Sequence, residues 1–452
     1  MPDLESLLDQ VDEMRDEIVA LEQDLVRIPT VNTGTMPTGN ETAACRYIEK
    51  WLAEDGIASE TIESAPDRGN LIARLEGSSG KAGLMFMSHL DVVPVEEEEK
   101  WRFPPFGAMV ADGRVFGRGA SDCKALLTCQ LIAMRILKRN NVELKDGLIL
   151  ASCADEEHGG RYGFGWMAEN YPEKLAAPYA VNEGGGVPIS AAGNLTYLLG
   201  IGEKGRLQLE IEVRGTSAHA STPWQGSNAL FGLSEVVKRI EAYEAERDTS
   251  TSLFDHLSMF AIEDKPLPTN IDQIIADNEE SQPRFASIMK ALSRMTITPT
   301  MIQGGIKSNS VPETVRLTCD IRTLPHQDEA YVRQELDKIL DGIEGVEIEI
   351  DYMSVPNSSP FETEFAERIQ ISTANALNRD DIQWVPSLTT GFTDSRFTRN
   401  LGTTTYGMVG SDPDDDPMIS FIHGTNESVG IRSLISGTRI MLSLAYDLLA
   451  VK

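Results

Sequence analysis

The sequence predicts an α/β protein with a mostly parallel central sheet, interrupted by a small α+β sandwich. Three observations lead to this fold class. Over the first two hundred residues, helical patterns alternate with short apolar strands, as in a sheet covered by helices. Residues 204–355 then follow the order β-α-β-β-α-β, which is typical of a ferredoxin-like unit. After Val355 the α/β pattern resumes, so the small unit lies inside the larger one.

The first part of the chain contains clear helix and strand patterns. Helical patterns cover residues 41–54, 123–139 and 162–170. Short apolar strands alternate with them: "NLIARL", "GLMFM", "GLILAS" and "YAVN". This alternation predicts one sheet with the helices packed around it.

The middle of the chain changes to strict alternation of apolar and polar residues. The strand "RLQLEIEVRG" is followed by a helical pattern at 228–246. Two alternating strands, "TPTMIQGG" and "ETVRLTCDIRT", a helix at 327–342 and the strand "VEIEIDYM" complete the unit. The polar stretch at about 247–295 is inserted in it and is predicted to be loop-like or weakly helical. We therefore expect a large domain of residues 1–203 and 356–452 and a small domain of residues 204–355.

Length and composition exclude several partners. A chain of 452 residues exceeds the usual size of one hydrophobic core, so two domains are expected. Forty basic and seventy acidic residues give a net charge of −30, which argues against nucleic acid and anionic membrane. Five dispersed cysteines without a CxxC motif suit a reducing cytosol. The acidic N-terminus is unlike a signal peptide and no run of eighteen apolar residues occurs, so we expect a soluble, cytoplasmic protein.

Candidate functional residues follow the ends of predicted strands. His89 and Asp91 come directly after an apolar strand, and ligands of α/β proteins bind at the carboxyl ends of strands. Asp91 could hold the second ring nitrogen of His89, as residues behind metal ligands do. A lone histidine is more often a surface or core residue than a ligand. Asp122, in "GRGASDCKA", has an equally good interpretation as a helix N-cap.

Further strand ends carry acids or a histidine. Glu156 and Glu157 follow the strand "LILASC", and buried carboxylates that lie together repel one another unless a cation compensates them. Adjacent side chains on extended backbone point in opposite directions, so one glutamate can face a metal while the other faces the bound substrate. Glu183 follows "YAVN", and His423 follows another apolar segment. A solvated turn is the alternative interpretation of these acids, and it fits poorly after an apolar strand.

Together the strand ends offer five candidate ligands: His89, Asp122, Glu157, Glu183 and His423. Two histidines and three carboxylates suit zinc, cobalt or manganese. Five ligands are too many for one open catalytic zinc. They fit two metal ions that share a carboxylate, each with one histidine and one further acid.

With these motifs the chain resembles metallopeptidase family twenty, the dinuclear zinc hydrolases that include aminoacylases, acetylornithine deacetylase, succinyl-diaminopimelate desuccinylase, and glutamate and Gly-X carboxypeptidases. The resemblance runs from about residue 20 to the C-terminus. It is carried by "SHLDVVP", "WRFPPFGAMVADGRVFGRGASDCKA", "ADEEHGG", "NEGGG", "GTSAHASTPWQGSNA", "NSVPETVRLTCDIRTLP", "GFTDSRF" and "HGTNESVG". It implies a zinc-peptidase-like catalytic domain interrupted by a ferredoxin-like lid and dimerisation domain, with the boundaries given above.

The resemblance also implies a role for each candidate ligand. Asp122 would bridge two divalent metal ions, most often zinc, with cobalt or manganese as alternatives. His89 and Glu183 would complete one metal site, and Glu157 and His423 the other.

Two further residues of the metal region take implied catalytic roles. Asp91 would orient His89, and Glu156 would be the general base. Two metals lower the pKa of a shared water from about 15.7 toward neutrality, and Glu156 would take its proton and return it to the departing amine. The resemblance implies a cis peptide bond between Asp122 and Cys123. The chain departs from the family at Ala125, where glycine is usual, and we expect only a small effect on helix packing.

The small domain carries further residues that the resemblance assigns to the substrate. His219, in "SAHAS", would stabilise the oxyanion in the active site of the partner subunit of a homodimer. Asn309 and Arg322 would bind a substrate carboxylate, and Arg396 in the large domain is a second arginine for that task. A polar loop histidine is the alternative for His219, and a structural salt bridge to Asp320 is the alternative for Arg322.

The predicted function is hydrolysis of an amide or peptide bond in a small carboxylate-bearing substrate, a dipeptide or an N-acyl amino acid. The alternative is a non-catalytic relative that binds metal or peptide with the same fold. The presence of Glu156 argues against that alternative, because a binding protein needs no base beside its metals. By resemblance, "NEGGG" favours the carboxypeptidase or dipeptidase branch over the deacylases.

Overall fold

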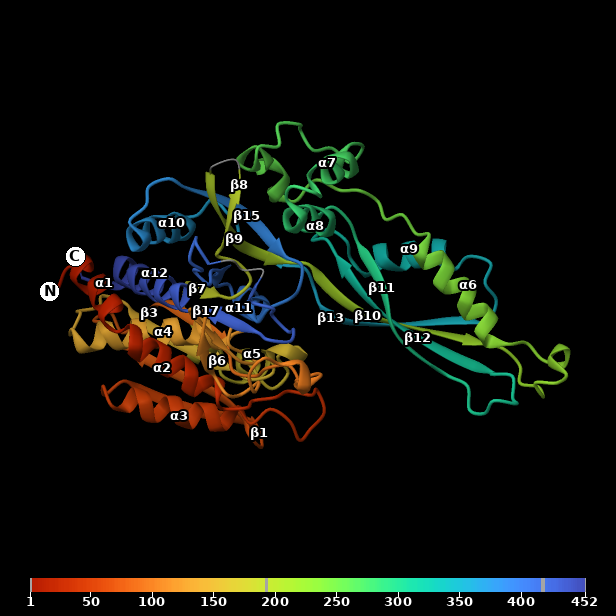
Figure 1. Ribbon diagram of the computed structural model, residues 1–452, viewed down its shortest axis with the longest axis horizontal. Helices are drawn as coiled ribbons and strands as arrows, with labels where there is room; N and C mark the ends of the chain where they lie inside the picture. The colour runs from red at the N-terminus through yellow and green to blue at the C-terminus, as the bar shows by residue number, and fades with distance from the viewer. Residues whose placement is uncertain (1, 192–193, 416–418, 452) are drawn as a thin grey trace.

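The computed structural model describes residues 2–191, 194–415 and 419–451 and has two parts of unequal size (Figure 1). The larger part holds both termini and a central sheet with helices around it. The smaller part projects from it and carries strands β10 to β13 with helices α6 and α9. The predicted α/β class with a mostly parallel central sheet is confirmed.

The central sheet has the strand order β1-β2-β6-β3-β7-β16-β9-β14, and β8 and β15 also pair with β9. Strands β6, β3, β7 and β16 are parallel neighbours. Both β3 and β6 are buried along most of their length, which explains their continuous apolar sequences. The strands are Ala58–Ala65 (β1), Arg68–Leu75 (β2), Ala82–His89 (β3), Gly147–Cys153 (β6), Tyr179–Asn182 (β7), Val187–Ala191 (β8), Asn194–Glu203 (β9), Asn357–Ser358 (β14), Ile382–Thr389 (β15) and Thr404–Gly407 (β16).

Helices bury both faces of this sheet. Leu84 and Phe86 of β3 belong to a core with α4 and α12, whereas Met85 and Met87 face a second core that includes α5. The helices of the large part are Leu4–Glu13 (α1), Arg15–Val26 (α2), Glu41–Ala53 (α3), Lys124–Arg139 (α4), Phe164–Asn170 (α5), Glu364–Leu377 (α10), Ser395–Asn400 (α11) and Ile431–Leu449 (α12). Within the described ranges, no helix is both long and apolar enough to cross a membrane.

A short sheet lies beside the start of α4 and α12. It joins Met109–Ala111 (β4), Arg114–Phe116 (β5) and Ser428–Gly430 (β17) in the order β17-β5-β4. Residues more than three hundred positions apart are thus held together by backbone pairing of Val115 with Val429.

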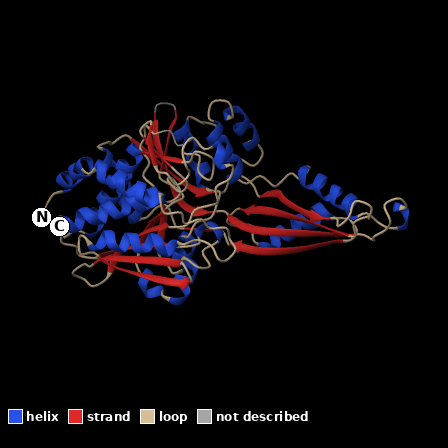
Figure 2. Cartoon of the chain, turned by 60° about the horizontal axis from the view of Figure 1, so that its bottom comes forward, coloured by secondary structure: helices blue, strands red, loops and turns tan. Residues whose placement is uncertain are grey.

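The small part is an antiparallel sheet of order β11-β12-β10-β13 with two helices on one face (Figure 2). Its elements are Gly205–Arg214 (β10), Ala229–Glu241 (α6), Thr296–Gly304 (β11), Thr314–Thr323 (β12), Glu329–Leu340 (α9) and Val346–Ser354 (β13). The alternation seen in the sequence of β10 buries Leu207, Leu209 and Ile211 against α6 and α9.

The stretch 247–295 forms helices, where the sequence predicted a loop-like or weakly helical segment. It contains a 3-10 helix at Ser252–Phe260, α7 at Ile271–Asn278 and α8 at Pro283–Leu292. The rings of Phe260 and Phe285 lie 4.0 Å apart between centroids. These side chains belong to the hydrophobic core of the large part, although the stretch interrupts the small part in sequence. Short amphipathic segments separated by polar turns produced the weak helical signal.

A buried ion cluster ties the start of α3 to the central sheet. The Arg68 guanidinium donates to both carboxylate oxygens of Glu41, at 2.9 and 3.0 Å. It also donates to Oδ1 of Asp155 at 3.0 Å, and all three side chains are almost fully buried. Asp155 precedes Glu156, so this cluster supports the loop that carries the predicted general base.

Arg68→Met should lower the free energy of unfolding by about 3–5 kcal/mol, because it leaves two buried carboxylates without their cation. Urea unfolding followed by circular dichroism measures the change. The control is Arg333→Met, which removes an exposed pair with Glu329 and should cost less than about 1 kcal/mol. Equal losses in the two variants would contradict a supporting role for the cluster.

Candidate active site

Three neighbouring parallel strands bring the predicted site residues to one edge of the sheet. His89 is the last residue of β3, Glu156 and Glu157 follow β6, and Glu183 follows β7. Because β6, β3 and β7 run in the same direction side by side, their carboxyl ends meet at this edge. Asp122 arrives from the turn before α4.

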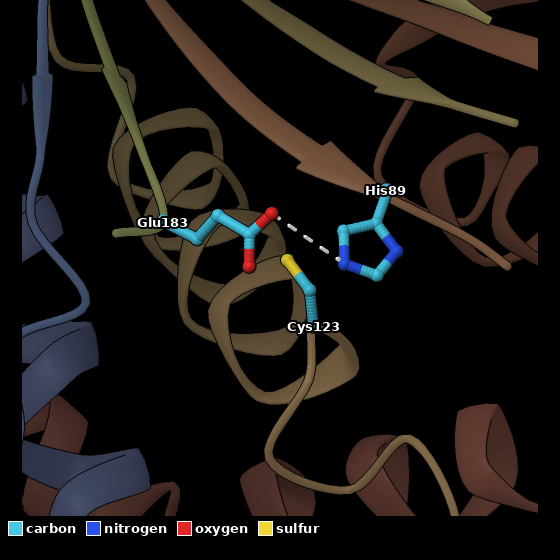
Figure 3. Close-up of side chains that lie close together, drawn as sticks. All are labelled: His89, Cys123 and Glu183. Atoms are coloured by element: carbon cyan, nitrogen blue, oxygen red, sulfur yellow. Dashed lines mark ion pairs between the residues drawn. The ribbon is translucent and has the colours of Figure 1, made fainter. Parts of the chain in front are cut away.

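The side chain of Asp122 lies between two histidines. Its Oδ1 is 2.9 Å from Nε2 of His89, and its Oδ2 is 3.1 Å from Nε2 of His423. Glu183 approaches the same ring nitrogen of His89, with Oε1 at 3.6 Å from Nε2 (Figure 3). Glu157 approaches His423, with Oε1 at 3.1 Å from Nε2. The five side chains therefore form two groups that share the carboxylate of Asp122.

The peptide bond between Asp122 and Cys123 is cis. The thiol of Cys123 lies near His89 and Glu183, and the ligand atoms of these three residues are within 4.8 Å of one another (Figure 3). Cys123 was not among the residues predicted from the sequence, and the structure brings its thiol to the site.

Asp91 contacts His89 through its backbone carbonyl and the loop of the two glutamates through its carboxylate. The Nδ1 of His89 lies 2.9 Å from the carbonyl oxygen of Asp91, whereas the Asp91 carboxylate is 3.5 Å away. That carboxylate accepts the backbone N–H groups of Glu156 and Glu157, at 3.1 and 3.2 Å. A ring N–H on Nδ1 leaves the Nε2 lone pair directed at Asp122 and Glu183. Asp91 thus lies behind His89, as expected, and also fixes the loop of the two glutamates.

Burial shifts the pKa values of the two glutamates Glu156 and Glu183 upward, whereas the neighbouring histidines hold the pKa of Asp122 well below its usual value. Burial and the charge of Glu183 raise the pKa of Glu156 well above its usual value. Burial and the charge of Asp122 raise the pKa of Glu183 to about 7. Hydrogen bonds that the His423 ring donates to the carboxylates of Asp122 and Glu157 raise the pKa of His423 to about 10. These shifts show that the acids and histidines of the site are strongly coupled to one another and to burial.

The donor set fits divalent metal ions. Imidazole nitrogens with carboxylate oxygens are the ligands of zinc, cobalt and manganese sites, whereas magnesium and calcium prefer oxygen alone. One group combines Asp122, Glu157 and His423, with ligand atoms within 4.8 Å of one another. Oε1 of Glu156 is buried and has no hydrogen-bond partner among the described residues, so it is available to a bound group.

Glu427 holds the turn that presents Asp122, and the sequence analysis missed it. Its Oε1 accepts the backbone N–H groups of Ser121 and Asp122, at 3.0 and 3.1 Å. Its Oε2 accepts a hydrogen bond of 2.6 Å from Arg118, which in turn donates to the carbonyl oxygen of His423 at 3.2 Å. The available signal was the position of this acid in "HGTNESVG", just before a buried strand.

The predicted substrate residues of the small part do not reach these ligands within one chain. His219 and Asn309 are exposed and adjacent, because the N–H of Ala220 donates to the carbonyl oxygen of Asn309 at 3.0 Å. The segment after β10, which carries His219, lies at the end of the small part away from the central sheet (Figure 1).

The two predicted arginines lie closer to the large sheet. Arg322 pairs with Asp320 at 2.6 Å, the structural alternative considered above, and its NH1 is 3.5 Å from the carbonyl oxygen of Thr390. Arg396 is buried and donates to the carbonyl oxygen of Gly159 at 2.9 Å, next to the loop of the two glutamates.

An α/β sheet that gathers histidines and acids at its strand ends defines the class of metal-dependent hydrolases. The chain belongs to peptidase family M20/M25/M40, whose model matches residues 85–447. It is therefore a hydrolytic enzyme that acts on small amide substrates, and the family resemblance seen in the sequence is confirmed.

Relatives cover most of the chain. It is 28% identical over 323 residues to a probable succinyl-diaminopimelate desuccinylase of Staphylococcus epidermidis, covering 71% of each chain. A metallo-carboxypeptidase of Sulfolobus solfataricus has a similar fold, with a TM-score of 0.72, 20% identity and coverage of 95% of this chain and 99% of the other. Human carnosine dipeptidase 1 also has a TM-score of 0.72, with 14% identity and 99% of each chain covered. A dinuclear metal-binding peptidase of Bacillus subtilis has a TM-score of 0.56, with 14% identity, covering 96% of this chain and 98% of the other.

Glu427→Gln should lower zinc affinity by about 10–100-fold, because it weakens the support of the Asp122 turn without removing a ligand. Competition with a chromogenic chelator measures the affinity, and circular dichroism checks the fold. Glu54→Gln is the matched control, since Glu54 is an exposed partner of Arg135. Unchanged zinc affinity in Glu427→Gln would show that Glu427 does not position Asp122.

Proposed function

We propose that this chain binds two divalent metal ions and hydrolyses the amide bond of a small substrate with a free carboxylate, a dipeptide or an N-acyl amino acid. His89, Asp122 and Glu183 would hold one ion, and Asp122, Glu157 and His423 the other. The observation that carries the proposal is the position of Asp122, whose two oxygens face two different histidines. Zinc is the proposed metal, with cobalt or manganese able to replace it.

Two bound divalent ions supply a Lewis acid for the amide carbonyl and lower the pKa of water. The residues of the chain do the remaining work. Glu156 accepts the proton of the attacking water at its free Oε1 and returns it to the leaving amine. Burial and the charge of Glu183 raise the pKa of Glu156, which makes its carboxylate a stronger base than a solvated glutamate. The carbonyl oxygen of Asp91 would favour the tautomer of His89 with its proton on Nδ1. The carboxylate of Asp91 accepts the backbone N–H of Glu156 and so helps to position this residue.

The substrate carboxylate would bind to Arg322 and Asn309 of the small part and to Arg396. Arginine matches a carboxylate with two parallel hydrogen bonds. Because Asn309 lies at the distant tip with His219, it would have to come from another subunit. We propose a homodimer in which 204–355 is the lid and dimerisation domain and His219 stabilises the oxyanion of the partner's site.

Exposed apolar residues on the small part support this homodimer. Trp224 and Phe231 are each 77% exposed, and Met301 and Ile302 lie on the exposed edge strand β11. Exposed apolar side chains of this kind favour contact with another copy of the chain. All five cysteines are buried free thiols, which supports a cytoplasmic location.

Metal removal and Glu156→Ala should separate binding from chemistry. Chelation should abolish hydrolysis of a panel of dipeptides and N-acyl amino acids, and zinc or cobalt should restore it in the unchanged enzyme. Glu156→Ala should still bind two ions per chain, while kcat falls by about 10²–10⁴-fold because the proton acceptor is lost. Metal analysis and steady-state kinetics measure both. Glu157→Ala is the contrast and should lose metal together with activity. Retained turnover in Glu156→Ala would remove the assigned base.

Mixing two inactive variants should test the shared site. In a dimer of His219→Ala with Glu156→Ala, one of the two sites keeps both Glu156 and a partner histidine. Subunit exchange in an equal mixture should therefore restore about a quarter of the original activity. Absence of any recovery, with mixed dimers demonstrated by mass spectrometry, would contradict a site completed across the subunits.

A further inference from the structure

A cavity of about 560 Å³ opens beside the predicted metal ligands. Asp122 and Glu183 border it at one end, so a group bound there would lie next to the reacting bond. Its volume falls within the range of about 300–1,000 Å³ that is typical of small-molecule sites. An acetyl group or a single methyl side chain would fill only a small part of it.

The walls of the cavity are mainly apolar. Leu126 at the start of α4, Leu198 on β9 and Leu388 on β15 are buried side chains that line it, and Val409 adds to them. Two of its serine hydroxyls are already bonded to the protein: Ser387 to the carbonyl oxygen of Leu388, and Ser433 to Asp415. The three leucines and Val409 thus offer an apolar surface to an occupant of the cavity.

One wall comes from the helix α8 of the inserted stretch 247–295. Arg284 and Ile288 line the cavity and lie four residues apart, which places them on the same face of this helix. Arg284 is the one cationic residue among the described lining residues, and it already interacts with another group of the protein. Apart from Arg284, the described lining residues offer no cation to a second negative charge on the substrate, and the carboxylates of Asp122 and Glu183 border the same cavity.

The residues proposed to bind the substrate carboxylate lie outside this cavity. None of Asn309, Arg322 and Arg396 belongs to the lining. The two regions meet at Thr390, which borders the cavity and whose carbonyl oxygen is 3.5 Å from Arg322. A substrate with its carboxylate at the arginines would place the group on the other side of the scissile bond in the cavity.

We propose that this cavity binds the acyl side of the substrate and selects an uncharged, apolar group larger than acetyl. Suitable groups are a medium-length fatty acyl chain or the side chain of an N-terminal leucine or phenylalanine. Ile288 on α8 is the specificity-determining residue of the wall that the inserted stretch contributes. The inference rests on the proposed hydrolysis and names the substrate class for it.

The test compares N-acetyl-, N-glutaryl- and N-hexanoyl-alanine with the zinc-loaded enzyme. Glutaryl and hexanoyl groups have similar lengths, and they differ in a terminal carboxylate. We expect kcat/KM for the hexanoyl substrate to exceed the other two at least about tenfold, since a single methylene in an apolar pocket is worth about tenfold or more.

Two variants of Ile288 should weaken the preference for the hexanoyl substrate, each in favour of a different competing substrate. Ile288→Lys should lower kcat/KM for the hexanoyl substrate by about tenfold or more and raise the ratio of glutaryl to hexanoyl hydrolysis. Ile288→Phe should narrow the cavity and shift the preference from hexanoyl toward acetyl. The matched control is Ile371→Lys, because Ile371 is an exposed isoleucine of α10 outside the cavity, and all three rates should stay unchanged.

The outcomes separate this inference from the function on which it rests. Equal or faster hydrolysis of the acetyl or glutaryl substrate, or no change of preference in either Ile288 variant, would overturn the apolar acyl site and leave the hydrolase proposal intact. No hydrolysis of any amide by the fully metal-loaded enzyme would overturn the proposed function and this inference together.

Discussion

The concentration of negative charge at one sheet edge is the constraint on which the rest of this structure depends. Asp122, Glu157 and Glu183 arrive from three separate segments and are brought within a few ångströms of two histidines. Buried carboxylates at this spacing repel each other, so compensating cations and a firmly held backbone stabilise the arrangement. Metal ions would provide the first. Hydrogen bonds hold the backbone firmly: Glu427 accepts from the N–H of Asp122, and Asp91 accepts from the N–H of Glu156.

The fold gathers these groups by simple means. Parallel neighbours in the central sheet end at the same edge, so three of the predicted ligands need only follow their strands. The remaining histidine, His423, comes from the last hundred residues, and the pairing of β17 with β5 brings that segment to the turn of Asp122. One ion pair between Arg118 and Glu427 then links the two halves of the site.

Much of this arrangement could be predicted from the sequence, because apolar runs that end in acids or histidine mark strand ends directly. The alternating strands of the small part were equally clear. Contacts between distant segments left no such signal: the support of Asp122 by Glu427, and the carbonyl of Asp91 as the nearest partner of His89, depend on tertiary packing. The helices of the stretch 247–295 were underestimated, since their short apolar faces become evident only against the core that they cover. The position of His219 relative to a catalytic site needs a second subunit, which a single chain cannot specify.

The inserted stretch also determines how the two parts of the molecule are connected. A small domain formed by one continuous insertion is joined to the large part by two chain connections, here near Lys204 and Val355. Since 247–295 returns to the core of the large part, the chain crosses two more times. Lys204 fastens the first crossing to the last of the inserted helices, donating to the carbonyl oxygens of Ala291 and Arg294 at 2.6 and 2.8 Å. Four chain crossings, with the first held to the end of α8 through Lys204, therefore connect the projecting part more firmly than two crossings would.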